Sequence, residues 1–128
     1  MHEIRWSLRP ADPSNFTGDA RSVMMASSGD RSSVRLFYVE FDPGARTHWH
    51  AHTGTQILLV RGGRCLLQRA GEPIEVLREG DTATIAPLVR HWHGAAPDEA
   101  TAHVAINLDN PETHWLGPVS DEEYASAR

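Results

Sequence analysis

The sequence has little cysteine, no long apolar run and no excess of positive charge, and each shortage excludes a class of protein. Cys65 is the only cysteine among 128 residues, which excludes an internal disulfide and a metal cluster built from several thiolates. Twelve Lys and Arg residues against 17 Asp and Glu residues give a net charge of -5, so we expect no nucleic-acid partner. The longest aliphatic run, Ile57–Val60, is far shorter than the roughly 20 residues that span a bilayer. The N-terminus lacks the apolar stretch of a secretion signal, so a cytoplasmic protein with no membrane partner is expected.

Short strands separated by turn signals account for most of the predicted structure. Runs rich in β-branched and aromatic residues end at turn sequences such as Asp42-Pro43-Gly44. We expect strands over 34–41, 55–60, 64–69, 74–77, 82–86 and 101–108. Gly62-Gly63 predicts a hairpin that joins 55–60 to 64–69. Short strands at spacings of about 8 to 12 residues indicate an all-β sandwich or barrel.

The chain is expected to form one domain with an extension at each end. Residues 1–33 are predicted to form an N-terminal arm that lies across the barrel or across a partner subunit. Residues 34–111 supply the barrel, and residues 112–128 form a C-terminal segment. In that segment Ser120 and Glu123 have the spacing of a capping box, which predicts a short helix docked by Tyr124.

The eight histidines are not scattered, and two His-Trp-His triplets stand at 48–50 and 91–93. On a strand, residues two apart share a face, so His50 and His52 project their imidazoles together. An isolated pair of this kind is typical of a strand surface, but a second triplet is hard to attribute to packing, because buried imidazoles need partners. Gln56 follows four residues later, and His91 could complete a set of four ligands from another strand. Imidazole with an amide oxygen suits Mn, Fe, Ni, Co or Zn, whereas the absence of thiolates argues against a structural zinc site.

These residues resemble the two sequence motifs of the cupin superfamily. The first motif is matched, with glutamine in place of its usual glutamate, by Gly44, His50, His52, Gln56 and Gly63. The second is matched by Gly80, Pro87 and His91, although Val89 stands where a turn glycine is usual. Within the superfamily the segments PGARTHWHAHTGTQILLV and HWHGAAP are similar to bacterial cupins related to carboxymuconolactone decarboxylase. That group includes manganese-dependent hydroxynitrile lyases.

The resemblance implies a single-domain cupin β-barrel of the jelly-roll type with one divalent transition metal. Manganese is the expected ion, with Fe, Ni, Co or Zn as alternatives. The ligands that the resemblance implies are His50, His52, Gln56 and His91. It further implies that the catalytic residues are His93 and His103. Cupins are often oligomers, so a homodimer or tetramer is expected.

Several side chains around this set have roles that the sequence leaves open. If His91 faces the barrel interior, strand alternation places His93 there too, where a free imidazole can act as general base. His103 either moves a substrate proton or orients a metal ligand. His48, Tyr38 and Arg46 are candidates for the substrate pocket, although for Arg46 the pattern favours a solvated turn residue.

Three functions are compatible with this pattern. The first is a metal-dependent enzyme that acts on a small carbonyl or hydroxy compound in the manner of a hydroxynitrile lyase, with the metal as Lewis acid and a histidine as base. The second is an Fe(II) cupin dioxygenase. The third is a cupin that binds a metal or a small ligand without catalysis.

Overall fold

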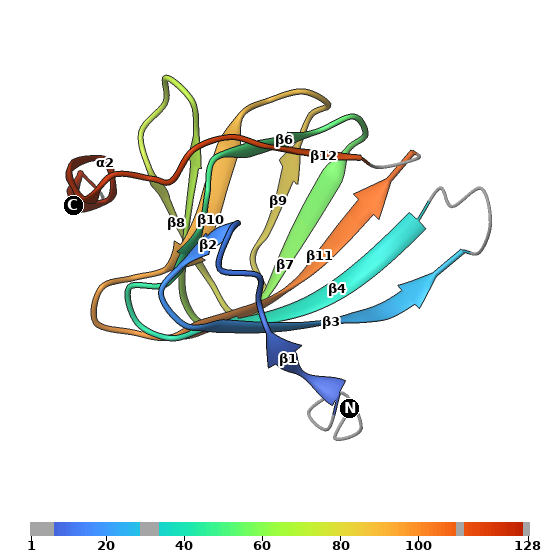
Figure 1. Ribbon diagram of the computed structural model, residues 1–128, viewed down its shortest axis with the longest axis horizontal. Coiled ribbons are helices and arrows are strands. Elements are labelled where there is room, and N and C mark those ends of the chain that lie inside the picture. The colour runs from blue at the N-terminus through green and yellow to red at the C-terminus, as the bar shows by residue number, and fades with distance from the viewer. Residues whose placement is uncertain (1–6, 29–33, 110–111, 127–128) are drawn as a thin grey trace.

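The computed structural model describes residues 7–28, 34–109 and 112–126, which form two antiparallel sheets curled into an open barrel (Figure 1). One long strand, β7 (Gln56–Arg69), belongs to both sheets. The first sheet also contains β1 (Arg9–Pro10), β3 (Ala20–Ser27), β4 (Val34–Phe41), β11 (Thr101–Leu108) and β9 (Thr82–Ile85). The second contains β2 (Phe16–Thr17), β5 (Arg46–Thr47), β6 (His50–His52), β8 (Glu75–Arg78), β10 (His91–Ala95) and β12 (Thr113–Trp115).

The predicted hairpin at Gly62-Gly63 is wrong, because β7 runs through both glycines as one strand that bends there. Before the bend β7 pairs with β9, and after it with β8 and β10. Gly63 has a φ of 71°, and a Cβ added to it would lie 1.8 Å from the carbonyl oxygen of Ala100. The register with β11 shifts at this point, as expected for a bulge, so the glycines redirect the strand from one sheet to the other.

The core lies between the two sheets and is built by alternate residues of each strand. Leu58, Val60 and Leu67 of β7 pack with Ile85 of β9 and Ala105 of β11, and all five are buried. Burial of each larger side chain contributes about 1.5–3 kcal/mol. A second cluster around Phe41 and Val39 closes the other end of the barrel. Apart from His93 on β10, the strands that carry the metal-ligand candidates fill their inward positions with packed apolar side chains such as Leu58, Val60 and Ala95.

The segments at both ends of the chain join the barrel. Within the predicted arm, β1 and β3 extend the first sheet and β2 pairs with β5, while residues 1–6 and 29–33 lie outside the described residues. The predicted C-terminal helix is confirmed as α2 (Asp121–Ala125), and Ser120 and Glu123 form the capping box. The Tyr124 hydroxyl donates to the carbonyl oxygen of Ala95 at 2.6 Å, which docks the helix on the second sheet.

Among the described residues, no helix has the length and apolar character needed to cross a membrane. The cytoplasmic location stays a prediction.

Candidate metal centre

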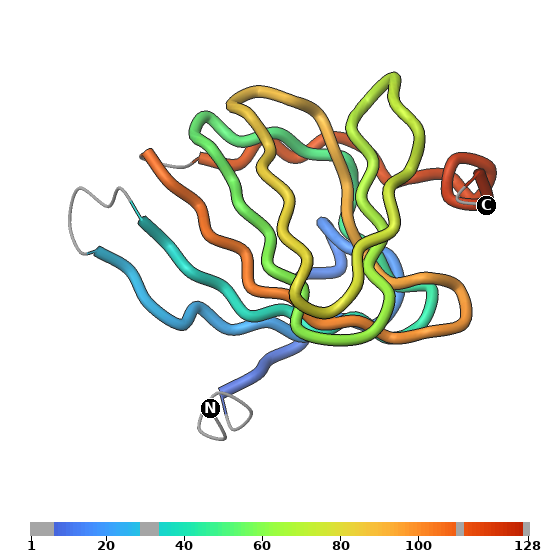
Figure 2. Tube along the Cα trace, turned by 180° about the vertical axis from the view of Figure 1, so that it is seen from behind, coloured from blue at the N-terminus to red at the C-terminus, as the bar shows by residue number. Residues whose placement is uncertain are grey.

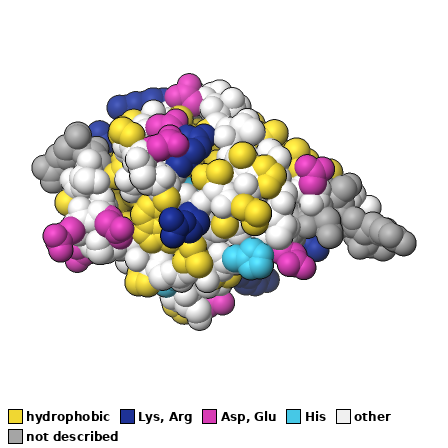
Figure 3. All heavy atoms as spheres, turned by 90° about the horizontal axis from the view of Figure 1, so that it is seen from above, with side chains coloured by type: hydrophobic (Ala, Val, Ile, Leu, Met, Phe, Trp, Pro, Cys, Tyr) yellow, Lys and Arg dark blue, Asp and Glu magenta, His cyan; other side chains and the backbone are white. Residues whose placement is uncertain are grey.

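Five buried histidines face the inside of the barrel from three strands. β6 supplies His50 and His52, β10 supplies His91 and His93, and β11 supplies His103. The ladder pairs His91 directly with His50, which brings the two triplets together although 41 positions separate them in the sequence. One histidine side chain stands at the surface of the face shown in Figure 3, whereas the five histidines of this cluster are buried. Four of them, His50, His52, His93 and His103, line a cavity of about 190 Å³ together with Gln56.

Backbone carbonyl groups fix the orientation of two imidazoles. Nδ1 of His50 donates to the carbonyl oxygen of His48 at 2.8 Å, and Nδ1 of His91 donates to that of Val89 at 2.9 Å. Since a carbonyl oxygen only accepts, the proton of each neutral ring is on Nδ1 and Nε2 carries a lone pair. Nδ1 of His52 lies 3.0 Å from the Thr113 hydroxyl, which orients the third ring.

The amide of Gln56 is held with its oxygen toward this cluster. Its Nε2 donates to Oδ1 of Asn107 at 2.8 Å, and its Oε1 lies 3.1 Å from Nε2 of His91. Gln56 Oε1 and His91 Nε2 then both carry lone pairs. Two hydrogen-bond acceptors 3.1 Å apart repel each other unless a cation lies near them. Nε2 of His52 is buried and has no hydrogen-bond partner among the described residues. This set of donors fits a divalent transition metal held by neutral nitrogen and oxygen atoms.

Burial keeps these imidazoles neutral, as metal ligands need to be. Desolvation lowers the pKa of His52 and of His91 to about 4. The pKa of His50 lies well below the ordinary value because of burial and of the neighbouring His91. Their lone pairs are thus available at neutral pH.

In protein stripped of metal, this histidine cluster is expected to cause acid unfolding. The folded-state pKa values are lowered from 6.5, so below pH 6.5 the unfolded chain binds more protons than the folded one. The free energy of unfolding is highest above pH 6.5. As the pH falls from 6.5 toward 4, it decreases by about 1.4 kcal/mol per histidine for each pH unit. Urea unfolding of chelator-treated protein at about pH 7.5 and about pH 5.5 measures this loss. Equal stability at both pH values contradicts the expectation, and His114→Ala, on an exposed histidine, is a control that keeps the dependence.

His93 and His103 form a hydrogen-bonded pair beside the three other rings. Nδ1 of His93 and Nε2 of His103 lie 3.0 Å apart, and both side chains are buried. The outer nitrogen of each ring, His93 Nε2 and His103 Nδ1, has no hydrogen-bond partner among the described residues. Burial lowers the pKa of His103 to about 4 and, together with the charge of His103, holds that of His93 well below the ordinary value. Ligand nitrogens of His50, His91 and His93 all lie within 4.8 Å of one another, so in this structure these three rings, with His93 rather than His52, are close enough to share one ion.

The three predicted pocket residues do not line the cavity. Tyr38 lies on the opposite face of β4 from Phe37 and Val39, which line the cavity, and its hydroxyl donates to Glu40. Arg46 is buried beneath the C-terminal segment, where Nη2 donates to the carbonyl oxygen of Val119 at 2.9 Å.

The His48 side chain is partly buried and does not line the cavity. His48 contributes to the site through its backbone carbonyl oxygen, which accepts the hydrogen bond from His50 Nδ1. The backbone leaves its regular strand path between β5 and β6, so alternation from His50 back to His48 does not hold.

Two aromatic residues that the sequence did not indicate border the cavity. Trp115 of β12 lies over His50, with ring centroids 4.7 Å apart, and Phe16 of β2 lies 6.1 Å from Trp115. Both come from the ends of the chain and carry no motif. Their place at the site follows from the pairing of β12 with β6 and of β2 with β5.

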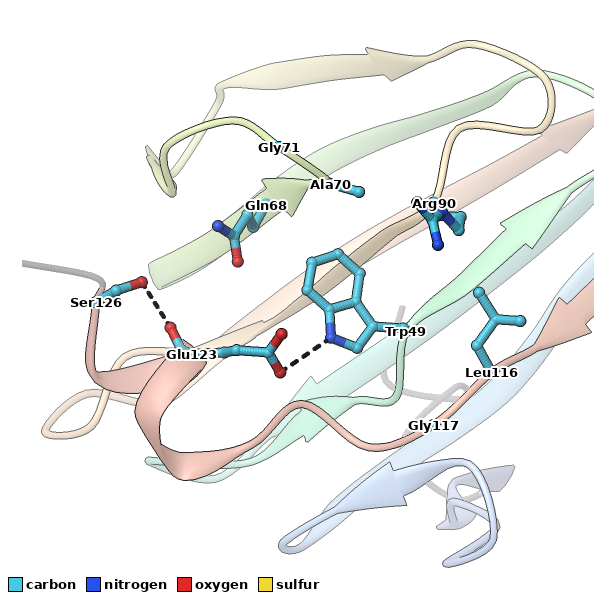
Figure 4. A pocket seen from close by; sticks show the side chains of 9 residues that line it. All are labelled: Trp49, Gln68, Ala70, Gly71, Arg90, Leu116, Gly117, Glu123 and Ser126. Carbon is cyan, nitrogen blue, oxygen red and sulfur yellow. Dashed lines mark hydrogen bonds between the residues drawn. The ribbon is translucent and has the colours of Figure 1, made fainter.

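Neither Trp residue of the two triplets lines the histidine cavity. Trp92 is fully buried against Leu66 and Tyr124. Trp49 lines a separate hollow of about 430 Å³ on the outside of the second sheet, where its indole donates to Glu123 at 3.3 Å (Figure 4). Arg90 and Leu116 also border this hollow, which shares no lining residue with the histidine cavity.

A barrel of this topology with inward histidines from β6 and β10 defines a cupin, and the comparison with known families agrees. Residues 37–108 match the family described as cupin domain, and the chain belongs to that family. The predicted all-β cupin fold with one short C-terminal helix is confirmed.

Among characterised proteins, the chain is 40% identical over 111 residues to a protein of Granulicella tundricola named (R)-mandelonitrile lyase, and the match covers 85% of each. Among solved structures, it is similar to a cupin-like protein of Thermotoga maritima, with 40% identity, a TM-score of 0.89, and coverage of 92% of this chain and 91% of that one. A polyketide cyclase of Streptomyces resistomycificus shares the fold at 15% identity, with a TM-score of 0.71 and coverage of 94% and 87%. The predicted relation to carboxymuconolactone decarboxylase stays a prediction.

Proposed function

We propose that this protein is a metal-dependent hydroxynitrile lyase that cleaves a small hydroxynitrile to a carbonyl compound and hydrogen cyanide. The observation that carries the proposal is the meeting of two groups of side chains in one cavity. A set of neutral donors with unpartnered lone pairs stands next to a buried pair of imidazoles that have free outer nitrogens. The relative named (R)-mandelonitrile lyase supports this choice of reaction.

The metal is assigned to His50, His52, Gln56 and His91, with manganese as the proposed ion. When bound, it supplies a Lewis acid that stabilises negative charge on a substrate oxygen or on cyanide. Three imidazoles and an amide are all neutral, so they leave the full charge of a divalent ion uncompensated.

The His93–His103 pair supplies proton transfer in either of its two tautomeric arrangements. If His93 Nδ1 donates, His93 Nε2 holds a lone pair and His103 Nδ1 holds a proton; if His103 Nε2 donates, the two outer nitrogens exchange these roles. Each arrangement therefore leaves one base and one N–H donor on two rings that both line the cavity. Because both rings are buried and neutral, the base is free at neutral pH.

The proposed cleavage uses the pair as base and then as acid. The free outer nitrogen takes the proton of the substrate hydroxyl, and the oxygen electron pair forms the carbonyl double bond as the carbon–carbon bond to cyanide breaks. The bond electrons leave with cyanide, which receives the proton from the imidazolium, so the pair returns to its neutral state.

The cavity walls favour a substrate with one aromatic or branched apolar group. Phe16, Phe37, Val39 and Trp115 supply apolar surface around the histidines. A volume of about 190 Å³ is small, which restricts the substrate to roughly one ring in addition to the reacting carbon.

An assay of the manganese-loaded protein with mandelonitrile, followed by aldehyde release, tests the proposal. We expect turnover that requires metal and leaves dissolved oxygen unchanged. Oxygen uptake with an Fe(II)-loaded sample, in place of aldehyde release, would favour the dioxygenase alternative. Metal binding without any turnover would favour the non-catalytic alternative.

Gln56→Glu is expected to lower the lyase rate about 10-fold or more while metal binding is kept. A carboxylate at this position cancels one unit of ligand-shell charge and weakens the Lewis acid. Asn107 can turn its amide to donate to the new carboxylate, so the side chain stays in place. Steady-state rates at saturating manganese, with metal content measured on the same samples, check the prediction. An unchanged rate would contradict the charge argument.

A further inference from the structure

The hollow beside Trp49, on the outside of the second sheet, is larger than the histidine cavity and takes no part in the proposed reaction. Its volume is about 430 Å³, against about 190 Å³ for the cavity. We call it the outer hollow. It is bordered by the loop between β7 and β8, by the residues just before β6 and β10, and by the segment that leads from β12 into α2. Figure 2 shows α2 and the loop between β7 and β8 at the same end of the molecule.

Backbone hydrogen bonds hold the walls of the outer hollow in place. The N–H of Trp49 donates to the carbonyl oxygen of Gly117 at 2.9 Å, and the N–H of Leu116 donates to that of Trp49 at 2.8 Å. On the other wall, the N–H of Ala70 donates to the carbonyl oxygen of Arg90 at 2.8 Å. The hollow is therefore formed without a ligand, as sites for small molecules usually are.

Trp49 gives the outer hollow an aromatic surface. Its side chain is only partly buried, and its indole N–H donates to Oε1 of Glu123 at 3.3 Å, which fixes the orientation of the ring (Figure 4). Leu116, which is 45% exposed, adds apolar surface beside it. An oriented indole in a concave surface is suited to stacking against a second planar ring.

Arg90 and Glu123 place opposite charges at the two ends of the outer hollow. Figure 4 shows them on opposite sides of the indole, and within the described residues neither takes part in an ion pair. In the same sheet Arg46, Arg64 and Arg69 each pair with a carboxylate. Arg90 thus presents a guanidinium that no described side chain neutralises, and a guanidinium binds a carboxylate through two parallel hydrogen bonds.

The opposite end of the outer hollow requires a hydrogen-bond donor. The N–H of Ser120 donates to Glu123 at 2.9 Å and lowers the pKa of that carboxyl, so Glu123 is ionised at neutral pH. An ionised carboxylate accepts hydrogen bonds and repels a second anion. A ligand that spans the indole therefore needs its carboxylate at Arg90 and a hydroxyl group at Glu123.

We propose that the outer hollow binds an aromatic carboxylate that carries a hydroxyl group at the far end of its ring, such as 4-hydroxybenzoate. The carboxylate pairs with Arg90, the ring lies against Trp49, and the hydroxyl donates to Glu123. The proposal requires neither a metal ion nor the lyase reaction, because the hollow and the histidine cavity share no lining residue.

Calorimetric titration of the full chain with 4-hydroxybenzoate, in manganese-loaded and in chelator-treated form, tests the proposal. We expect one site with a dissociation constant of about 1 mM or lower in both forms. Arg90→Gln should raise this constant at least about 10-fold, and Trp49→Leu at least about 3-fold. Arg61→Gln, at an exposed arginine of β7 outside the hollow, is the matched control and keeps the wild-type affinity.

A probe of reversed charge tests the role of Arg90 without any substitution. 4-Hydroxybenzylamine has an ammonium group in place of the carboxylate, and we expect it to bind at least about 10-fold more weakly. The proposal is overturned if 4-hydroxybenzoate does not bind at about 10 mM, or if the amine binds equally well. It is also overturned if a folded Arg90→Gln variant keeps the wild-type affinity. Binding that disappears when the chain is treated with chelator would place the carboxylate on an ion in the histidine cavity, and would likewise exclude the outer hollow.

Discussion

His103→Ala is expected to lower hydroxynitrile cleavage by about 10²- to 10⁴-fold, the usual contribution of a positioned proton-transfer group. The variant removes one ring of the buried pair and leaves Nδ1 of His93 without its partner at 3.0 Å. The lost ring holds either the base or the N–H donor, and within the described part of the chain His93 is the one other imidazole that lines the cavity outside the assigned ligands. The loss is measured as the change in turnover at saturating substrate and manganese.

Metal content separates the two roles that the sequence leaves open for His103. Proton transfer predicts that His103→Ala keeps one ion per chain, whereas a role in orienting a ligand predicts that metal is lost together with activity. His114→Ala, on the exposed face of β12, is the control and keeps both. A turnover within about threefold of the wild-type value would contradict a proton-transfer role.

His91→Ala is expected to abolish metal binding and to reduce lyase activity to background. The variant removes a ring whose Nδ1 is fixed by Val89 and whose Nε2 faces the Gln56 oxygen at 3.1 Å. When metal binding is lost, the stabilisation of the folded protein by the bound ion should also be lost. This stabilisation amounts to about 4 kcal/mol when the free metal concentration is 1,000 times the dissociation constant. Thermal unfolding with and without added manganese, together with elemental analysis, gives both results.

The matched control for this variant is His48→Ala, in the other triplet. The His48 side chain lies outside the cavity, and its contribution to the site is a backbone carbonyl that alanine retains. We therefore expect His48→Ala to bind manganese as the wild type does. A His91→Ala protein that still carried one tightly bound ion would exclude His91 from the ligand set.

The sequence predicted the parts of the site that depend on strand alternation. His50 with His52, and His91 with His93, share inward faces because the strands around them are regular. His103 and Asn107 of β11 are four residues apart, so alternation puts them on one face as well, and both line the cavity. The capping box at Ser120 was equally local, and it formed as predicted.

Features that depend on tertiary pairing were not predictable from one sequence. Gly62-Gly63 is compatible with a hairpin or with a bend inside one strand, and the pairing of β7 with two different neighbours selects the bend. Tyr38 was assigned to the pocket without knowledge of how β4 pairs with its neighbours. The register of β4 with β11 places the Tyr38 side chain on the outer face of the sheet. Trp115 reaches the cavity because β12 pairs with β6, a contact between segments about 60 residues apart with no local signal.

We expect one divalent ion inside the barrel, held by three imidazoles and one carboxamide. Anomalous diffraction at the manganese edge from crystals of metal-loaded protein tests it most directly. The account predicts a single peak within about 2.0–2.4 Å of ring nitrogens of His50, His52 and His91 and of the Gln56 oxygen. A fully loaded crystal with no peak in the cavity, or with an ion bound by a different set of side chains, would contradict it.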